Sequence, residues 1–118
     1  MKKETQLLAN EIASNVFRAA RTEMWVQSTN GGNVICRRLN KCNAFVIETP
    51  NFYLLRSYQT FVGAIRKSDN TCVNYMHHEY DFKGNNCTGA TTTRQFYKFV
   101  KQYSPDYENA RIITWKAV

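Results

Sequence analysis

The sequence predicts an α+β fold, a small single domain over residues 1–118 with two helices packed on an antiparallel sheet of about five strands. Three observations predict it. The length of 118 residues suits one domain. The 43% of hydrophobic residues can form one core. The elements follow the order helix, strands, helix, strand, and both helices are expected against one face of the sheet.

The first element is an amphipathic helix, expected over residues 3–22 because apolar residues recur there at helical spacing. The apolar stripe consists of Leu8, Ile12, Val16 and Ala20, and it is widened by Leu7 and Phe17. Residues 28–33 are a cluster of Ser, Thr, Asn and Gly, which predicts a turn after the helix.

Alternating apolar segments predict the sheet. Strands are expected at 34–38 and 43–48, with a tight turn at 39–42 between them. The segment 52–66 is rich in aromatic and β-branched residues, so it is expected to form the longest strand. Both of its faces are partly apolar, which predicts a central position. Gly63 within it predicts a bulge or a close backbone approach.

The chain is expected to turn back after that strand. A hairpin turn is predicted at 67–70 and a returning strand at 71–80. A loop rich in glycine and asparagine is expected at 81–90. The last strand is expected within 110–118, where apolar side chains alternate.

The threonine run at 91–93 predicts the start of a second helix. Thr92 with Gln95 fits a capping box, in which each side chain bonds a backbone N–H of the first turn. Ser104 followed by Pro105 predicts where the helix ends. The residues at helical spacing that are expected to enter the core are Phe96, Phe99, Val100 and Tyr103.

The chain is strongly basic, with 16 Lys and Arg against 9 Asp and Glu, a net charge of +7 and a pI near 9.4. Such an excess in a small domain favours polyanionic partners, above all nucleic acid. Residues 34–67 contain six basic side chains and one acidic one, and residues 83–101 contain four and none. This clustering favours a basic face over a merely soluble basic surface.

Basic and aromatic residues are also interleaved. Arg56 lies near Tyr53 and Tyr58, and Lys98 follows Tyr97. Aromatic faces can stack on exposed bases while cations hold phosphates, although strand tyrosines also pack in cores. The candidate residues for binding nucleic acid or another partner are Arg37, Arg38, Lys41, Arg56, Arg66, Arg94, Tyr97, Lys98 and Lys101.

No motif for catalysis is recognisable, so a non-enzymatic protein without a cofactor is expected. The sequence has no glycine-rich phosphate loop, no nucleophile elbow and no H-E-x-x-H. His77, His78 and Glu79 with Asp81 form its one dense cluster of ionisable groups. A small metal-dependent nuclease using His77, His78 and Asp81 is therefore a weaker alternative to an exposed strand end.

The four cysteines do not follow the spacing of a zinc site. Five residues separate Cys36 from Cys42, and fourteen separate Cys72 from Cys87. Zinc ligands usually come in pairs with about two to four residues between them. Neither an export signal nor a membrane span is recognisable, so free thiols in a reducing cytoplasm are expected.

Three stretches carry a resemblance: LLRSYQTFVGAI, HEYDFKG and TTTRQFYKFV. Over residues 52–103 the chain resembles a group of small uncharacterised proteins from phages and mobile elements of gut bacteria. The matching positions are Ser57, Tyr58, Thr60, Val62, Ile65, Tyr80, Thr92, Thr93, Phe96 and Phe99. The long first helix, the cysteines and the insertion at 84–90 depart from the pattern.

The resemblance implies a biological context and not a particular chemistry. Proteins of this context often bind host defence or replication machinery, and anti-CRISPR proteins are one example. It therefore implies a binder of nucleic acid or of a nucleoprotein effector in the cytoplasm of a bacterial host, concretely an inhibitor of a CRISPR-Cas complex. A protein–protein interaction module without nucleic-acid contact is the alternative. The sequence does not determine the oligomeric state.

Overall fold

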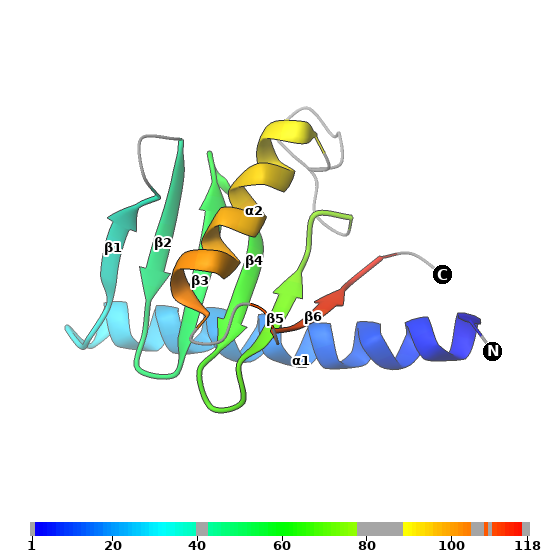
Figure 1. The fold of residues 1–118 in the computed structure, drawn as a ribbon. Coiled ribbons are helices and arrows are strands. Elements are labelled where there is room, and N and C mark those ends of the chain that lie inside the picture. The colour runs from blue at the N-terminus through cyan, green and yellow to red at the C-terminus, as the bar shows by residue number, and fades with distance from the viewer. Residues whose placement is uncertain (1, 40–42, 78–88, 105–107, 109, 117–118) are drawn as a thin grey trace.

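The described residues form six strands in one mixed sheet and two helices in the computed structural model (Figure 1). The structure describes residues 2–39, 43–77, 89–104, 108 and 110–116. The helices are α1 (Lys2–Thr29) and α2 (Ala90–Tyr103). The strands are β1 (Ile35–Arg38), β2 (Ala44–Glu48), β3 (Phe52–Ser57), β4 (Thr60–Arg66), β5 (Thr71–Asn74) and β6 (Arg111–Thr114).

The strands lie in the sheet in the order in which the chain makes them. The first five form an antiparallel meander, and β6 adds to β5 in parallel. The α+β class is confirmed, but the sheet has six strands where about five were predicted, and it is mixed where an antiparallel one was predicted. The parallel pair arises because α2 follows β5 in the chain and precedes β6. This connection brings the chain back to the end of the sheet where β5 begins, so β6 runs in the same direction as β5.

The long strand predicted at 52–66 is two strands. Tyr58 and Gln59 form a turn between β3 and β4, and Tyr58 has a φ of +55°. Glycine or asparagine normally occupies this left-handed conformation, so residue preferences did not indicate a turn here. The resulting β3 and β4 are the two central strands of the sheet, as the apolar character of both faces predicted.

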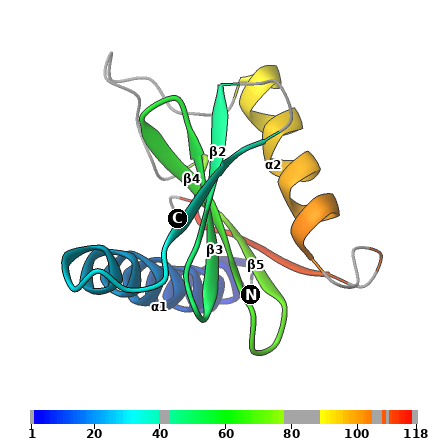
Figure 2. The ribbon, with the colours of Figure 1, turned by 90° about the vertical axis from the view of Figure 1, so that its left-hand side faces the viewer.

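Each face of the sheet is covered by one helix (Figure 2). Leu55 packs in one core with Phe96 of α2, and its neighbour Leu54 packs in a second core with Val16 of α1. Both leucines have no exposed surface. Adjacent strand residues point to opposite faces, so both faces need a cover. The prediction that both helices lie against one face is therefore wrong.

α1 is longer than the predicted helix at 3–22, and the predicted stripe is confirmed in part, since Ile12, Val16, Phe17 and Ala20 pack against the core. The side chains buried against the sheet are those of Ala13, Val16 and Ala20. Leu7 and Leu8 are exposed, although the periodicity placed them in the apolar stripe. Gln6, in the same turn, donates a hydrogen bond of 2.9 Å to the Thr114 carbonyl of β6, so this part of α1 lies on the sheet edge and the two leucines are on the side that faces away from it. Periodicity alone does not show which side of the helix packs on the sheet.

The start of α2 also differs from the prediction. The helix begins at Ala90 after the N-cap residue Gly89, which makes no side-chain capping bond. The capping box of Thr92 and Gln95 is therefore absent. Gln95 instead accepts a buried hydrogen bond of 2.6 Å from the Ser57 hydroxyl. This bond fastens the first turns of α2 to the end of β3.

The end of α2 agrees with the prediction. Ser104 is the C-cap residue, and its hydroxyl donates a hydrogen bond of 2.9 Å to Asn70 Oδ1 in the turn before β5. The buried residues of the helix include Phe96, Phe99 and Val100, and Tyr103 packs partly buried against the same core. Both ends of α2 are thus tied to the sheet, and its apolar face is fixed toward β3 and β4.

Several predicted segments lie partly outside the described residues. These are the turn residues 40–42, residues 78–80 of the predicted strand and the loop residues 81–88. The strand predicted at 71–80 is shorter than expected, because β5 ends at Asn74 and residues 75–77 are not in a strand. The turn at 67–70 is confirmed. No helix in the described part of the chain combines the length and the apolar character needed to cross a membrane.

Gly63 lies where α2 approaches the sheet most closely. The register of β3 and β4 shifts at Leu55 opposite it, which confirms the predicted bulge. A Cβ atom at Gly63 would lie 2.8 Å from two ring atoms of Phe96 and 3.2 Å from the carbonyl oxygen of Val73. Because the ring of Phe96 is fully buried, we expect Gly63→Ala to lower the free energy of unfolding by about 1–3 kcal/mol. Urea unfolding followed by circular dichroism measures this loss.

Gly89→Ala is the matched control. A Cβ atom at Gly89 would meet no atom within 4 Å, so the substitution should change the free energy of unfolding by less than about 1 kcal/mol. An equal loss in the two variants would show that the contact with Phe96 is not what requires a glycine at position 63.

Candidate nucleic-acid interface

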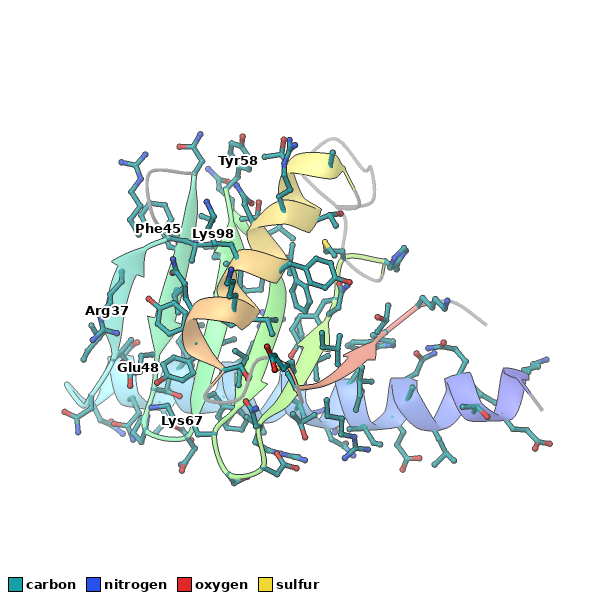
Figure 3. The ribbon with its side chains drawn as sticks, in the orientation of Figure 1. Arg37, Phe45, Glu48, Tyr58, Lys67 and Lys98 are labelled. Carbon is teal, nitrogen blue, oxygen red and sulfur yellow. The ribbon has the colours of Figure 1, made fainter. Side chains whose placement is uncertain are left out.

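The outer face of α2 carries three cations and an exposed tyrosine. We call Arg94, Tyr97, Lys98 and Lys101 the α2 basic surface; all four side chains are exposed. The three cations lie at helical spacing on the side opposite the buried Phe96. Lys98 projects from α2 on the side of β2 (Figure 3).

The charges of the α2 basic surface are not compensated by described residues. No acidic residue occurs in the sequence of α2. The ion pairs between described residues involve other cations, so Arg94, Lys98 and Lys101 have none there. Tyr97 is 45% exposed, and its ring meets the buried ring of Phe96 at a nearly perpendicular angle, with centroids 5.4 Å apart. An anion can therefore approach the cations without displacing a carboxylate of a described residue.

A second exposed tyrosine lies beside the first turns of α2. Tyr58 is 57% exposed, and its left-handed φ of +55° costs about 1 kcal/mol in a non-glycine residue. Its neighbour Ser57 bonds Gln95, which places Tyr58 at the N-terminal end of α2 (Figure 3). Tyr53, by contrast, packs against Tyr103 with ring centroids 5.0 Å apart. Tyr58 is thus available for stacking, whereas Tyr53 belongs to the core.

Arg37 lies on the same sheet face as α2, but it is paired with an acid. Its partner across the ladder is Val46, which packs in the α2-side core. Arg37 Nη1 lies 2.7 Å from one oxygen of Glu48, and Lys67 Nζ lies 2.8 Å from the other (Figure 3). Lys67 Nζ also lies 4.6 Å from the ring centroid of Tyr53. Glu48 therefore compensates Arg37, which the sequence had offered as a binding cation.

Arg66 is compensated within its own hairpin. Its guanidinium makes two parallel hydrogen bonds to Asp69, 2.9 Å from Nε and 2.7 Å from Nη2. Such paired bonds are the strong geometry of an arginine with a carboxylate. Asp69 also accepts the backbone N–H of Thr71 at 3.2 Å. These hydrogen bonds therefore stabilise the turn between β4 and β5.

Arg38 and Arg56 lie on the other face of the sheet. Both face Phe45 across the strands, and Phe45 is on the α1 side because its neighbour Val46 is on the α2 side. The Arg56 guanidinium lies 5.1 Å from the ring centroid of Phe45. Its Nε is buried without a hydrogen-bond partner among the described residues. These two arginines form a row with Phe45 and do not extend the α2 basic surface.

The candidate residues therefore do not share one surface. Arg94, Tyr97, Lys98 and Lys101 are together, Arg37 is on the same face but paired, Arg66 is on a hairpin, Arg38 and Arg56 are on the opposite face, and Lys41 lies outside the described residues. The sequence analysis missed Phe45 and Glu48. The turn at Pro50 and Asn51 could have revealed Phe45, since Phe45 and Arg56 each lie five residues from it and face each other. The pairing of Glu48 with Arg37 depends on the register of β1 and β2, which this turn does not fix.

The described residues contain no group that could hold a metal ion. His77 is exposed, while His78, Glu79 and Asp81 lie outside the described residues. No three or more His, Cys, Asp or Glu side chains of the described part converge. Cys36 in β1 and Cys72 in β5 are free. Three strands separate them, roughly 19 Å at the spacing of a sheet, so these two thiols do not share a ligand.

Comparison with known proteins leaves the family open. No protein-family model matches this chain, and it matches neither the curated proteins nor the solved structures. Function is therefore inferred from the residues and from their geometry.

The pKa of Glu48 predicts how the ion-pair network responds to pH. Hydrogen bonds from Lys67 and Arg37 lower this pKa below its ordinary value of 4.5. A carboxyl with a lowered folded-state pKa stabilises the fold above its unfolded pKa, and it loses that contribution as the pH falls toward the folded value. We expect Glu48→Gln to lower the free energy of unfolding by about 1 kcal/mol at pH 7, with the loss shrinking below about pH 4. Urea midpoints measured across this pH range give the difference.

Glu108→Gln is the control for this variant, because Glu108 is exposed and forms no ion pair with a described residue. Its effect should stay within about 0.5 kcal/mol at every pH. If the loss caused by Glu48→Gln were as large at pH 3 as at pH 7, the ion pairs would not be its source.

The two described thiols should differ in reactivity. Burial raises the pKa of Cys72 to about 11, so about one thiol in a thousand is ionised at pH 8. Cys36 is exposed. We expect iodoacetamide to label Cys36 at least about a hundred times faster than Cys72 in the native protein, and to label both once urea unfolds the chain. Peptide mass spectrometry measures both rates, and equal native rates would contradict the burial of Cys72.

Proposed function

We propose that this chain is a non-enzymatic binding protein that engages nucleic acid or a nucleoprotein complex through the α2 basic surface. One observation carries the proposal. Arg94, Lys98 and Lys101 are exposed together on a helix without acidic residues, and none forms an ion pair with a described residue. The net charge of +7 adds long-range attraction for polyanions.

The spacing of the three cations suits a phosphate backbone. Arg94 and Lys101 are seven residues apart, about 10 Å along the helix. Each phosphate that a cation neutralises releases counterions, which supplies affinity that falls with salt. Tyr97 and Tyr58 offer exposed rings on which bases can stack. Stacking requires unpaired bases, so a single strand is the form of nucleic acid that this surface favours.

The concrete version of the proposal is an inhibitor of a bacterial defence effector, such as a CRISPR-Cas complex, acting in the cytoplasm of a bacterial host. The resemblance of residues 52–103 to small proteins of phages and mobile elements supports this version. An effector of this kind is a nucleoprotein whose guide strand presents a phosphate backbone. The α2 basic surface would compete for that backbone without chemistry and without a cofactor.

A protein–protein interaction module is the second candidate. The exposed Tyr58, Tyr97 and Arg94 favour it, because tyrosine and arginine are enriched among the residues that dominate interface energies. The two candidates use the same surface. They differ in whether the affinity depends on phosphates.

Reversing two charges on α2 tests the proposal. We expect Arg94→Glu combined with Lys98→Glu to weaken binding to a fluorescein-labelled single-stranded RNA of about 20 nucleotides by roughly 10- to 100-fold. The slope of log affinity against log salt should fall by about 2, because two phosphate contacts are lost. Fluorescence anisotropy between about 50 and 200 mM salt measures both quantities.

The matched control is Lys3→Glu combined with Arg111→Glu, which changes the net charge equally. Both residues are exposed, and Lys3 lies on the first turn of α1, far from α2 (Figure 1). An equal loss of affinity in the two double variants would reduce the interaction to net charge and contradict a defined α2 site. The outcome would support the protein–protein module if a host protein stays bound to the wild-type chain after nuclease treatment. In that case the α2 double variant should lose this protein and the control double variant should keep it.

A further inference from the structure

The side of α1 that faces away from the sheet exposes large apolar residues near both of its ends. Leu7 and Leu8 are 51% and 62% exposed, and Trp25 and Val26 are 67% and 37% exposed. α1 has 28 residues and is therefore about 42 Å long. In Figures 1 and 2 no described element lies on this side of the helix. These two apolar pairs are candidates for contact with another protein surface if one partner covers both.

These residues are exposed because the core has fixed the opposite side of the helix. Val16 and Ala20 are buried against the sheet. At about 100° per residue, the helix then turns Leu8, Asn15 and Val26 away from the sheet. We call the side chains of Leu7, Leu8, Glu11, Asn15, Arg18, Thr22, Trp25 and Val26 the outer stripe of α1.

The outer stripe is arranged symmetrically about its middle. The pairs Leu7–Leu8 and Trp25–Val26 are eighteen residues apart, about 27 Å along the axis. Their common midpoint falls close to the middle of the helix. If two copies of α1 lie antiparallel, the leucines of each copy meet Trp25 and Val26 of the other. A two-fold axis produces this contact twice, which is the property of a self-complementary dimer interface.

The charges of the outer stripe select the antiparallel orientation. Glu11 lies in the first half of α1 and Arg18 in the second, and Glu11 forms no ion pair with a described residue. With Leu8 of one copy opposite Trp25 of the other, Glu11 faces the partner's Thr22 and lies one helical turn from its Arg18. A parallel pair would instead place Glu11 beside Glu11 and Arg18 beside Arg18. Opposite charges meet only in the antiparallel pair.

The middle of the outer stripe allows the helices to approach each other. An open hollow of about 550 Å³ is lined by Asn15, Arg18, Ala19, Thr22, Glu23 and Val26. Four of its six lining residues, Asn15, Ala19, Thr22 and Val26, have short side chains. In the antiparallel arrangement, the leucines of the second copy lie over the end of this hollow that Val26 borders.

We propose that this chain forms an antiparallel two-fold homodimer through the outer stripe of α1. The inference is independent of the proposed nucleic-acid binding, because α1 and α2 lie on opposite faces of the sheet (Figure 2). The dimer leaves both α2 basic surfaces uncovered. The protein is therefore a candidate for bivalent binding along one polyanion, which raises avidity without a new contact.

Sedimentation velocity under reducing conditions tests the dimer, because the reductant prevents disulfides through the exposed Cys36. Across about 1–200 µM protein we expect the mass to rise from 13.8 kDa to twice that value. Leu8→Ser combined with Trp25→Ser should keep the chain monomeric over this range. Ile112→Ser is the control, since Ile112 is 39% exposed on β6 and outside α1, and it should leave the dimer unchanged. A wild-type chain that stays monomeric at 200 µM overturns the proposal.

A charge swap tests the orientation. Glu11→Arg and Arg18→Glu should each weaken dimerisation by at least about tenfold, because each places like charges together. The double variant should restore the dimer to within about threefold, because the pairing is re-formed with its signs exchanged. Both residues are exposed, so thermal melts should show an unchanged fold. A dimer that is insensitive to the single swaps, or that the double swap does not restore, overturns the antiparallel arrangement.

Discussion

Both side-chain rows of the central strands are buried, and the rest of the architecture depends on this constraint. Leu54 and Leu55 follow each other in β3 and point to opposite faces, yet neither has exposed surface. One helix covers one face, so the chain needs α1 on one side and α2 on the other. Each helix therefore commits one side to a core and leaves one side outward. The two outward sides are the surfaces from which function is inferred.

The strand register, and not the total charge, determines which cations are available. A net charge of +7 shows that cations exceed acids, but it does not show where they are compensated. The ladder of β1 and β2 brings Arg37 to Glu48, and a three-residue separation brings Arg66 to Asp69. α2 has no acid in its sequence and makes no strand pairing. The α2 basic surface therefore gathers three exposed cations that form no ion pair with a described residue.

Local patterns predicted much of the fold, and tertiary position explains what they missed. The buried side of α2 followed from the spacing of Phe96, Phe99 and Val100, because helical periodicity is local. The same helical periodicity predicted that the cations of α2 are exposed. Leu8 is exposed because the sheet packs on the side of α1 that carries Ala13, Val16 and Ala20, and this choice of side is made by tertiary packing and not by a local pattern. The sequence analysis placed Arg56 in one set with the α2 cations. The sheet face on which Arg56 lies depends on its pairing with Phe45 across a turn, and local patterns do not contain that pairing.

The two outward surfaces share no residue, but charge couples them. In the proposed dimer, two copies with a net charge of +7 each repel each other, and this repulsion would oppose the burial of Leu8 and Trp25. A polyanion bound to Arg94, Lys98 and Lys101 reduces that net charge, so it lowers the repulsion between the copies. Linkage then requires that dimerisation strengthens polyanion binding by the same factor. A small domain with one surface on each side of its sheet can in this way make assembly depend on its ligand without any change of shape.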